Sequence, residues 1–445
     1  MSTDTLPVLP ASDQDKTTAG NYFVSNYPPF SFWKPENVPQ VQAAFDRPPR
    51  EGATLGMYTH IPFCRKRCHF CYFKVYTDKN AAAIKQYLDA VITELSRYAT
   101  RPFIGGRKPK YLYFGGGTPS YLSPEQLIYL TDGMKAILPW DAMEEVAFEC
   151  EPGTINERKL VALKEIGVTR LSLGVEHFDA DILSVNNRAH DNKAIYKAYE
   201  TAREVGFDQI NIDLIAGMVN ETPEKWKDAV AKAIALDPEC VTIYQMEIPF
   251  NTTIYHDMKE SGQLVAPVAD WHTKREWVNY AFGELEKHGY TVTSAYTAVK
   301  NPQQSKFLYR DELWHGADML SLGVSSFGII DGVHYQNEAN IERYVERIEA
   351  GESAIFRAMT MSEDEKFIRE FILQLKLGSV QTAYFKEKFG VDVKERFAAL
   401  LATYQREGWV TSVNGTIQLS RDGLLQVDRL LHGFFLPQHR TNRIT

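Results

Sequence analysis

The sequence has no long hydrophobic run and no basic leader, and each absence argues against a class of protein. No stretch of about 18 apolar residues occurs in the 445-residue chain, so we predict no membrane-spanning helix. The first twenty residues, MSTDTLPVLPASDQDKTTAG, do not combine a basic segment with an apolar core, as a secretory signal would. We therefore expect a cytoplasmic protein.

Excess positive charge and internal repeats are also missing. The chain has 49 Lys and Arg against 57 Asp and Glu, giving a formal net charge of −8. A nucleic-acid-binding protein usually carries a basic surface, so we expect no nucleic-acid partner. No repeat at fixed period appears, while 44% apolar and 24% charged residues are ordinary for a globular protein.

Cysteine is scarce, but three of the five cysteines lie within eight residues. Cys64, Cys68 and Cys71 form a C-x3-C-x2-C array in the phrase YTHIPFCRKRCHFC. An odd number of thiols cannot pair completely as disulfides, and clustered cysteines in a reducing compartment indicate metal binding or catalysis. Cys150 and Cys240 each lie inside an apolar run, so we predict that they are buried.

Three clustered thiolates can hold a 4Fe–4S cube and leave one iron without a protein ligand. Two alternatives stay open from the cysteines alone. One is a zinc site that takes a fourth ligand from His60 or His69, and the other is a set of reactive or surface thiols. The basic residues Arg65, Lys66 and Arg67 would offset the negative charge of a cluster or face an electron donor.

Short apolar runs alternate with amphipathic helical patterns over the first part of the chain. Strands are predicted at 55–61, 110–117, 145–152, 169–175, 209–217 and 241–248. Helices are predicted at 80–99, 123–137, 156–166, 192–205 and 222–236. Six such units in series favour an α/β fold with a parallel sheet, as a partial (β/α)6 TIM-like barrel or, second, a doubly wound sheet. In either case ligands bind at the carboxyl ends of the strands.

The chain divides into three predicted parts. Residues 1–54 form a polar tail and an aromatic arm, NYFVSNYPPFSFW. Residues 55–358 form the barrel and an annex to its sheet, built from 290–299 and 318–337. Residues 359–445 form a mostly helical domain with a hairpin that turns at Asn414-Gly415 and a final helix, RDGLLQVDRLLHGFF. This arrangement is typical of a winged-helix unit, and its even mixture of charges favours a structural lid over DNA binding.

Four segments place glycines or charged residues at the ends of predicted strands. A glycine run, YFGGGTPSYL, follows the second strand, where glycine allows the backbone to approach a ligand closely. Glu149 and Glu151 alternate in FECEPGT and would share one face of a strand. Glu176 ends another strand, Arg188 could clamp a carboxylate, and Asp213 lies in an apolar strand, where we favour a position facing the barrel lumen.

Taken in order, these phrases resemble the radical S-adenosylmethionine (SAM) superfamily, and within it the oxygen-independent coproporphyrinogen III oxidase-like branch. The matching phrases are YTHIPFCRKRCHFC, YFGGGTPSYL, FECEPGT, RLSLGVEHFD, NRAHD, GFDQINIDLIAGM and LGVSSFGIIDGVHYQN, and they extend over about residues 55 to 435. The resemblance implies a partial barrel of radical SAM type.

The resemblance also implies the cofactors and the residues that bind them. Cys64, Cys68 and Cys71 would ligate a 4Fe–4S cluster whose fourth iron binds SAM, which is cleaved to a 5′-deoxyadenosyl radical, and a second SAM would lie beside the first. No catalytic side chain is assigned. The predicted cofactor-binding residues are Tyr58, Phe70, Gly116, Gly117, Thr118, Glu149, Glu176, Arg188 and Asp213.

The branch contains more than one activity, so three functions are considered. We expect an enzyme that abstracts hydrogen from a carbon of a tetrapyrrole or other hydrophobic skeleton, with flavodoxin or ferredoxin as electron donor. Methyl or methylene transfer with two SAM molecules is one alternative, and a non-catalytic haem chaperone is the other. The sequence departs from the oxidase pattern at Tyr72-Phe73, where the oxidase has Gly-Cys, and at Glu176, where it has Gln.

Overall fold

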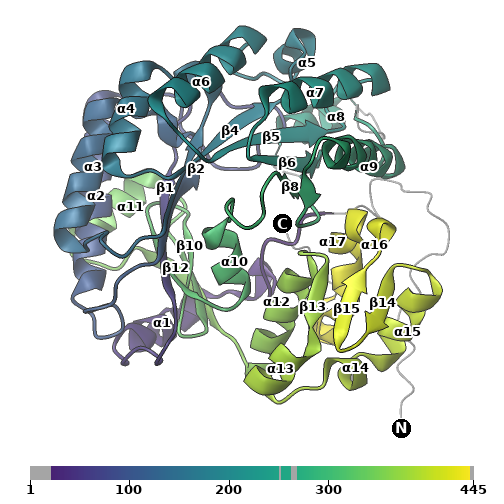
Figure 1. Cartoon of the computed structure of the whole chain (residues 1–445). Helices are drawn as coiled ribbons and strands as arrows, with labels where there is room; N and C mark the ends of the chain where they lie inside the picture. The colour runs from purple at the N-terminus through teal and green to yellow at the C-terminus, as the bar shows by residue number, and fades with distance from the viewer. Residues whose placement is uncertain (1–21, 250–251, 262–267, 441–445) are drawn as a thin grey trace.

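A computed structural model describes residues 22–249, 252–261 and 268–440 of the chain. Within these residues the fold has one 12-stranded mixed sheet, ordered β12-β11-β10-β9-β1-β2-β3-β4-β5-β6-β8-β7, and one 3-stranded sheet (Figure 1). No helix among the described residues is long and apolar enough to cross a membrane. The predicted polar tail at 1–20 lies outside the described residues.

The central strands of the large sheet form the predicted partial barrel. Their bounds are β1 Leu55–Ile61, β2 Tyr111–Gly116, β3 Glu145–Cys150, β4 Arg170–Glu176, β5 Ile210–Ala216 and β6 Cys240–Gln245. Each pairs in parallel with the next, in chain order. The order never reverses within β1–β6, which excludes the doubly wound alternative and confirms the open (β/α)6 arrangement.

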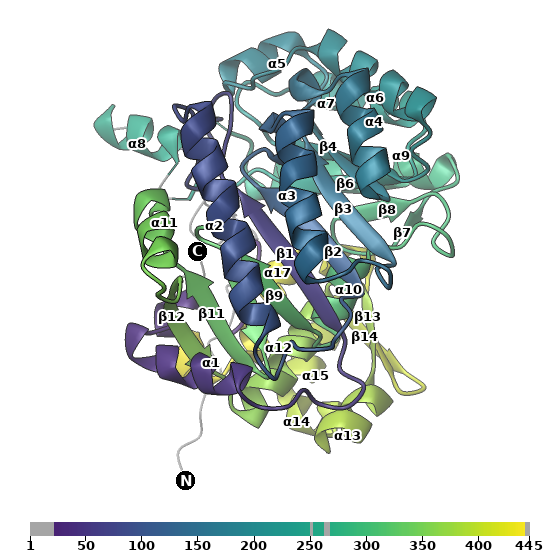
Figure 2. The same ribbon diagram turned by 90° about the vertical axis from the view of Figure 1, so that its left-hand side faces the viewer.

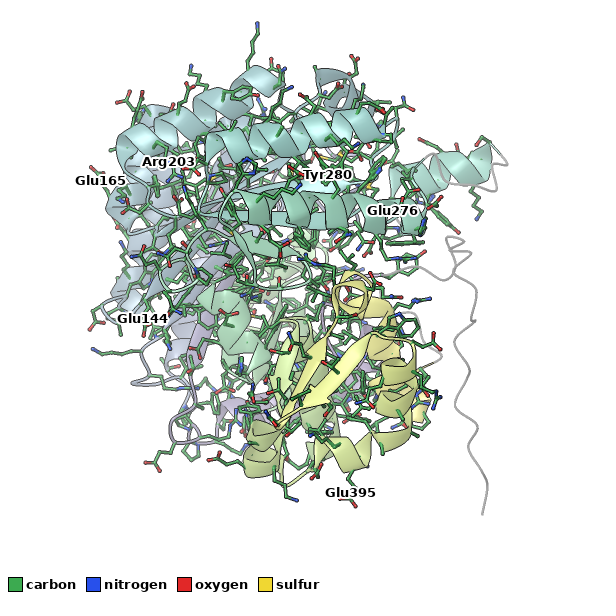
Figure 3. All side chains as sticks on the ribbon, turned by 45° about the vertical axis from the view of Figure 1, so that its right-hand side comes forward. Glu144, Glu165, Arg203, Glu276, Tyr280 and Glu395 are labelled. Carbon is green, nitrogen blue, oxygen red and sulfur yellow. The ribbon has the colours of Figure 1, made fainter. Side chains whose placement is uncertain are left out.

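Helices connect these strands and cover their outer face, as Figure 2 shows for α2, α3 and α4. They are α2 Ala81–Ala99, α3 Pro124–Ile137, α4 Glu157–Ile166, α5 Ala180–Val185, α6 Asn192–Val205 and α7 Pro223–Leu236. Capping fixes their starts: Ser123 and Gln126 form a capping box at α3, and the Thr222 side chain accepts from Lys225 at α7. The outer faces carry charge, with Glu165 on α4 and Arg203 on α6 labelled in Figure 3.

The two edges of the barrel sheet are extended by a mainly antiparallel annex. Its strands are β7 Thr291–Val292, β8 Thr297–Val299, β9 Asp318–Leu322, β10 Phe327–Ile330, β11 Val333–Asn337 and β12 Ile355–Thr360. Strand β9 pairs with β1 in parallel, whereas β10, β11 and β12 continue antiparallel. The remaining helices here are α1 Val38–Phe45, α8 Thr253–Glu260, α9 Trp271–Lys287, α10 Leu308–Trp314 and α11 Ile341–Glu349. Because β12 ends at Thr360, we propose the domain boundary just after that residue.

The C-terminal part forms a second hydrophobic core around a three-stranded sheet. Its elements are α12 Glu363–Leu375, β13 Ser379–Gln381, α13 Thr382–Phe389, α14 Val393–Arg396, α15 Ala398–Arg406, β14 Val410–Val413, β15 Thr416–Leu419, α16 Arg421–Leu425 and α17 Val427–Leu431. The hairpin turns at Asn414 and Gly415, both with positive φ, as predicted. The predicted single final helix is wrong: Gln426, at φ −125°, separates α16 from α17.

The aromatic arm joins the two cores, as an irregular segment with one short 3₁₀ turn, Phe30–Phe32. Val24 and Tyr27 are fully buried among the C-terminal core residues. The buried Lys376 ammonium donates to the Val24 carbonyl at 2.7 Å and pairs with Asp428 at 3.0 Å. The arm is therefore a structural part of the C-terminal unit, which also contacts the barrel through Phe23 and Tyr244.

Candidate functional site

The cysteine loop follows β1 at the carboxyl end of the barrel strands. Its two ends are held together, because Cys64 donates its backbone N–H to the Tyr76 carbonyl at 3.0 Å and Tyr76 donates to Pro62 at 2.9 Å. Cys64 is buried, Cys68 and Cys71 are half-buried, and all three thiols are free. The loop thus presents three reduced cysteines on one closed segment.

The surroundings of these thiols fit a cluster better than a single metal ion. Burial raises the pKa of Cys64 to about 12 and that of Cys71 to about 11, and each thiol is within electrostatic reach of Cys68. In the described part of the chain, no three His, Cys, Asp or Glu side chains converge on one metal position. A zinc ion would need its ligands within about 2.3 Å of one point, whereas a cubane takes each thiolate on a different iron.

Each histidine of the zinc alternative has one ring nitrogen turned to a group other than a cysteine. The His60 ring contacts the Tyr58 hydroxyl, with 3.1 Å between Nδ1 and the oxygen, and burial lowers the pKa of His60 to about 4. His69 directs Nδ1 to the Val185 carbonyl at 3.1 Å. In the described part of the chain, neither histidine joins the cysteines in a group that could hold one metal ion.

The glycine run packs tightly against the start of the cysteine loop. Gly117 donates its N–H to the Ile61 carbonyl and Thr118 to the Phe63 carbonyl, both at 2.8 Å. A Cβ on Gly116, whose φ is +113°, would lie 2.5 Å from the His60 ring. Glycine is thus required here for close packing. Because the N–H groups of the run already donate to protein acceptors, its carbonyl oxygens are the backbone groups that a ligand could contact.

Three candidate residues face the interior of the barrel. Tyr58, Glu149 and Asp213 are each the one half-buried residue in an otherwise buried strand, β1, β3 and β5. Because alternate residues share a face of a strand, such isolated exposure marks the side that faces the barrel interior and not the covering helices. The predicted position of Asp213 in the lumen agrees with this geometry.

Hydrogen bonds hold the lumen carboxylates in place. Glu149 accepts from the Tyr113 hydroxyl at 2.6 Å and from the Gly116 N–H at 3.3 Å, and burial raises the pKa of Glu149 to about 7. Asp213 accepts from Ser172 and Asn211, each at 2.8 Å, and burial raises its pKa as well.

Arg188 connects the strand ends to the cysteine loop. One guanidinium nitrogen donates to the Cys68 sulfur at 3.2 Å, and the other donates to the Gly174 carbonyl at 2.6 Å and lies 3.4 Å from the Glu176 carboxylate. Glu176, the last residue of β4, has a positive φ of 62°, and the pairing of β4 with β5 shifts its register between Gly174 and Glu176. The predicted clamp is therefore occupied by the protein's own carboxylate and thiol.

Glu151, the second carboxylate of FECEPGT, also binds the cysteine loop, through Arg65. It pairs with Arg65 at 3.0 Å and with His190 Nδ1 at 2.9 Å. Burial raises the pKa of Glu151, but the His190 hydrogen bond and the nearby Arg65 charge together bring that pKa below its usual value. His190 is the histidine of NRAHD, and its contact with Glu151 is not predicted from the sequence because the two residues lie on different loops.

Aromatic rings line the lumen beyond the predicted set. Tyr113 stacks on Tyr58 and on Tyr309, with ring centroids 6.1 and 4.5 Å apart. Tyr113 and Tyr244 lie at alternating strand positions that could have been read from the sequence, whereas Tyr309 follows an irregular segment and gives no pattern. Phe70 instead packs against the apolar cluster that contains Ile182, Ile215, Met218, Met246 and Ile254.

The sequence of the chain matches two protein-family models. Residues 58–233 match the model described as the Radical SAM superfamily, which spans the cysteine loop and most of the barrel. Residues 361–425 match the HemN C-terminal domain, which spans α12 to α16.

Curated relatives and a solved structure match most of the chain. The heme chaperone HemW of Bacillus subtilis is 28% identical over 379 residues, covering 85% of this chain and 98% of the relative. The oxygen-independent coproporphyrinogen III oxidase of Escherichia coli is 26% identical over 393 residues, covering 84% and 83%. The structure of the coproporphyrinogen III oxidase HemN from Escherichia coli superposes with a TM-score of 0.81 at 24% identity, covering 93% of this chain and 96% of that one.

Proposed function

The chain belongs to the radical SAM superfamily, in its coproporphyrinogen III oxidase-like branch, and from that premise we propose that it is an oxidoreductase-type enzyme that removes hydrogen from a carbon of its substrate. The superfamily uses a 4Fe–4S cluster and SAM. When bound, the pair supplies a 5′-deoxyadenosyl radical that abstracts a hydrogen atom from an unactivated carbon.

One observation carries the proposal: the cysteine loop, the glycine turn and the lumen carboxylates meet at the carboxyl ends of β1 to β5. The three thiols lack a common metal position and lie beside a buried guanidinium, which offsets the negative charge of thiolates. We propose that Cys64, Cys68 and Cys71 hold the cluster. Arg188 then acts as a positioning residue, because it fixes Cys68 relative to Glu176.

The lumen residues supply the contacts that a bound SAM needs. We propose that Glu149 accepts hydrogen bonds from the ribose hydroxyls and that carbonyls of the turn at Gly116, Gly117 and Thr118 receive the ammonium group. Asp213 would complete the polar wall, and Tyr58 would pack against the cofactor. The site of a second SAM stays a prediction.

The electron donor is proposed to dock near the basic segment Arg65–Arg67. All three residues of this segment are exposed and lie on the same loop as the cysteines. A small acidic electron carrier, such as a flavodoxin or ferredoxin, would meet this segment with complementary charge. The same proposal places the protein in the cytoplasm, where such carriers occur.

Two other functions compete with hydrogen abstraction followed by oxidation. A relative named heme chaperone favours haem binding without turnover, which predicts stoichiometric haem uptake and little SAM cleavage. Methyl or methylene transfer would produce S-adenosylhomocysteine, and neither relative reported above is named for that reaction.

The products formed from SAM distinguish these functions. Anaerobically reconstituted, reduced protein is incubated with SAM and either coproporphyrinogen III or haem, and the products are separated by mass spectrometry. We expect 5′-deoxyadenosine without S-adenosylhomocysteine. Tight haem binding without 5′-deoxyadenosine under any reductant would instead support the chaperone and contradict the enzyme.

A further inference from the structure

The side chain of Thr118 contacts one of the three cysteines of the loop. Its Oγ1 lies 3.2 Å from the Sγ of Cys64, which is the buried cysteine of the three. As a thiol, Cys64 can be either the donor or the acceptor of this hydrogen bond. As a thiolate it can only accept, because its proton is gone, so the Thr118 hydroxyl then donates. This hydroxyl is a different group from the Thr118 carbonyl, which is proposed to face SAM.

The backbone around Thr118 holds this hydroxyl beside the sulfur. Thr118 precedes Pro119, and a residue before proline is restricted to extended backbone; its φ and ψ are −141° and 91°. The Thr118 N–H donates to the carbonyl of Phe63, the residue directly before Cys64, at 2.8 Å. A β-branched side chain also has few χ1 rotamers. Thr118 therefore contacts this segment through both its backbone and its side chain.

The three sulfurs differ in the groups that surround them. Cys68 accepts from the Arg188 guanidinium at 3.2 Å. Cys71 lies 4.0 Å from the Phe73 carbonyl, which is an acceptor and cannot bond to a thiolate. The donor beside Cys64 is a neutral hydroxyl. A loop with three thiolates would therefore have a cationic donor on one sulfur and a neutral donor on another.

Hydrogen bonds to the sulfurs of an iron–sulfur cluster change its reduction potential. One-electron reduction adds negative charge, and part of this charge lies on the thiolates. A hydrogen-bond donor beside a thiolate therefore stabilises the reduced state more than the oxidised state. The effect is larger in a buried site than in water, because the local dielectric is low. The hydroxyl beside the buried Cys64 therefore favours the reduced state.

We propose that Thr118 raises the reduction potential of the cluster by donating a hydrogen bond to the Cys64 thiolate, and so makes the cluster easier to reduce. The electron comes from the flavodoxin or ferredoxin of the proposed function, on which this inference rests, and no proton or other atom is transferred. Because the hydroxyl acts on a ligand of the cluster and not on the substrate, Thr118 is a positioning residue whose effect appears in the potential.

The test is a redox titration of the full-length, anaerobically reconstituted protein without SAM, monitored by electron paramagnetic resonance of the reduced cluster. Thr118→Val replaces the hydroxyl by a methyl group of similar size and keeps the backbone contact to Phe63. At a fixed potential, its ratio of reduced to oxidised cluster should be about threefold to tenfold below that of the wild type, a shift of about 30–60 mV to more negative potential.

Two further variants separate the hydrogen bond from packing. Thr118→Ser keeps the hydroxyl and loses the methyl group, so its potential should lie closer to the wild type than to Thr118→Val. Thr59→Val is the matched control, because Thr59 is fully buried on β1 and its hydroxyl has no hydrogen-bond partner among the described residues. This control should leave the potential unchanged.

Three results would overturn the proposal once iron content has been measured in every variant. They are an unchanged potential in Thr118→Val, an equal shift in Thr59→Val, and a Thr118→Ser protein that behaves like Thr118→Val. Loss of iron from Thr118→Val would also overturn it, because the hydroxyl would then serve cluster assembly and not the potential.

The outcomes for this inference and for the proposed function are separable. Because SAM is absent from the titration, the potentials remain measurable in a protein that forms no 5′-deoxyadenosine, and that result would contradict the proposed function alone. A wild type that binds no iron would contradict both.

Discussion

Replacing Lys376 by Met should detach the aromatic arm from the C-terminal core. Lys376 and Asp428 are 0% and 1% exposed, and their charged atoms lie 3.0 Å apart. Lys376 also donates to the Val24 carbonyl, and Asp428 accepts from the Val24 N–H at 2.8 Å. One buried ion pair thus holds both backbone polar groups of Val24.

The expected cost follows from leaving a buried carboxylate without its cation. Removing one partner of a buried ion pair typically costs about 3–5 kcal/mol. Lys366→Met on α12, the helix that Lys376 caps, is the control. Lys366 and Glu363 are 28% and 81% exposed, and such a pair contributes about 0–1 kcal/mol. Adding Asp428→Asn to Lys376→Met should recover about 1–3 kcal/mol, since the uncompensated charge disappears.

Urea unfolding gives the free energies, and chymotrypsin, which cleaves after aromatic residues, reports on the arm. We expect cleavage between residues 22 and 33 in Lys376→Met under native conditions, and resistance in the wild type and in Lys366→Met. Equal stability and equal resistance of the two single variants would refute the role assigned to this ion pair.

Three other predictions concern the loop, the turn and pH. Gly116→Ala should lower the free energy of unfolding by several kcal/mol and impair cluster assembly, because its Cβ would lie 2.5 Å from a histidine ring. Gly206→Ala is the control: its φ is +91° but no atom lies within 4 Å of the added Cβ, so the loss should be only about 1 kcal/mol. Urea unfolding measures both values. Arg65→Met should lower iron retention during gel filtration, through loss of its 3.0 Å ion pair, and Lys66→Met should not. Burial raises the pKa of Glu94 from 4.5 to about 7, so folding takes up a proton between these pH values. The free energy of unfolding should therefore fall as pH rises from about 4.5 to about 7. A difference in unfolding free energy between the wild type and Glu94→Gln that does not change with pH would contradict this.

Most of the barrel could be predicted because its pattern is local. Each predicted strand from β1 to β6 and each of the five predicted helices lies within a few residues of its observed bounds. N-cap residues such as Ser123 and Thr222 define the helix starts by hydrogen bonds within four residues. The prediction of one final helix was wrong because the amphipathic pattern continues through Gln426, where the helix is interrupted.

The candidate site could be predicted only where its residues follow short phrases. The cysteines and the glycine turn are adjacent in sequence to the strands that position them. The His190–Glu151 pair, the Lys376 anchor and the ring contact between Phe23 and Tyr244 join segments that are far apart in the chain. The spacing of residues along the sequence does not predict such long-range contacts, so only the structure shows them.

The most direct test of the central claim is the iron content of cysteine variants after anaerobic reconstitution. The wild type, Cys150→Ala and Cys240→Ala should bind about four iron atoms per chain, whereas Cys68→Ala should lose the cluster and its broad absorbance. Cys150 and Cys240 are buried in the barrel and control for general damage. Full iron content in Cys68→Ala would contradict the account.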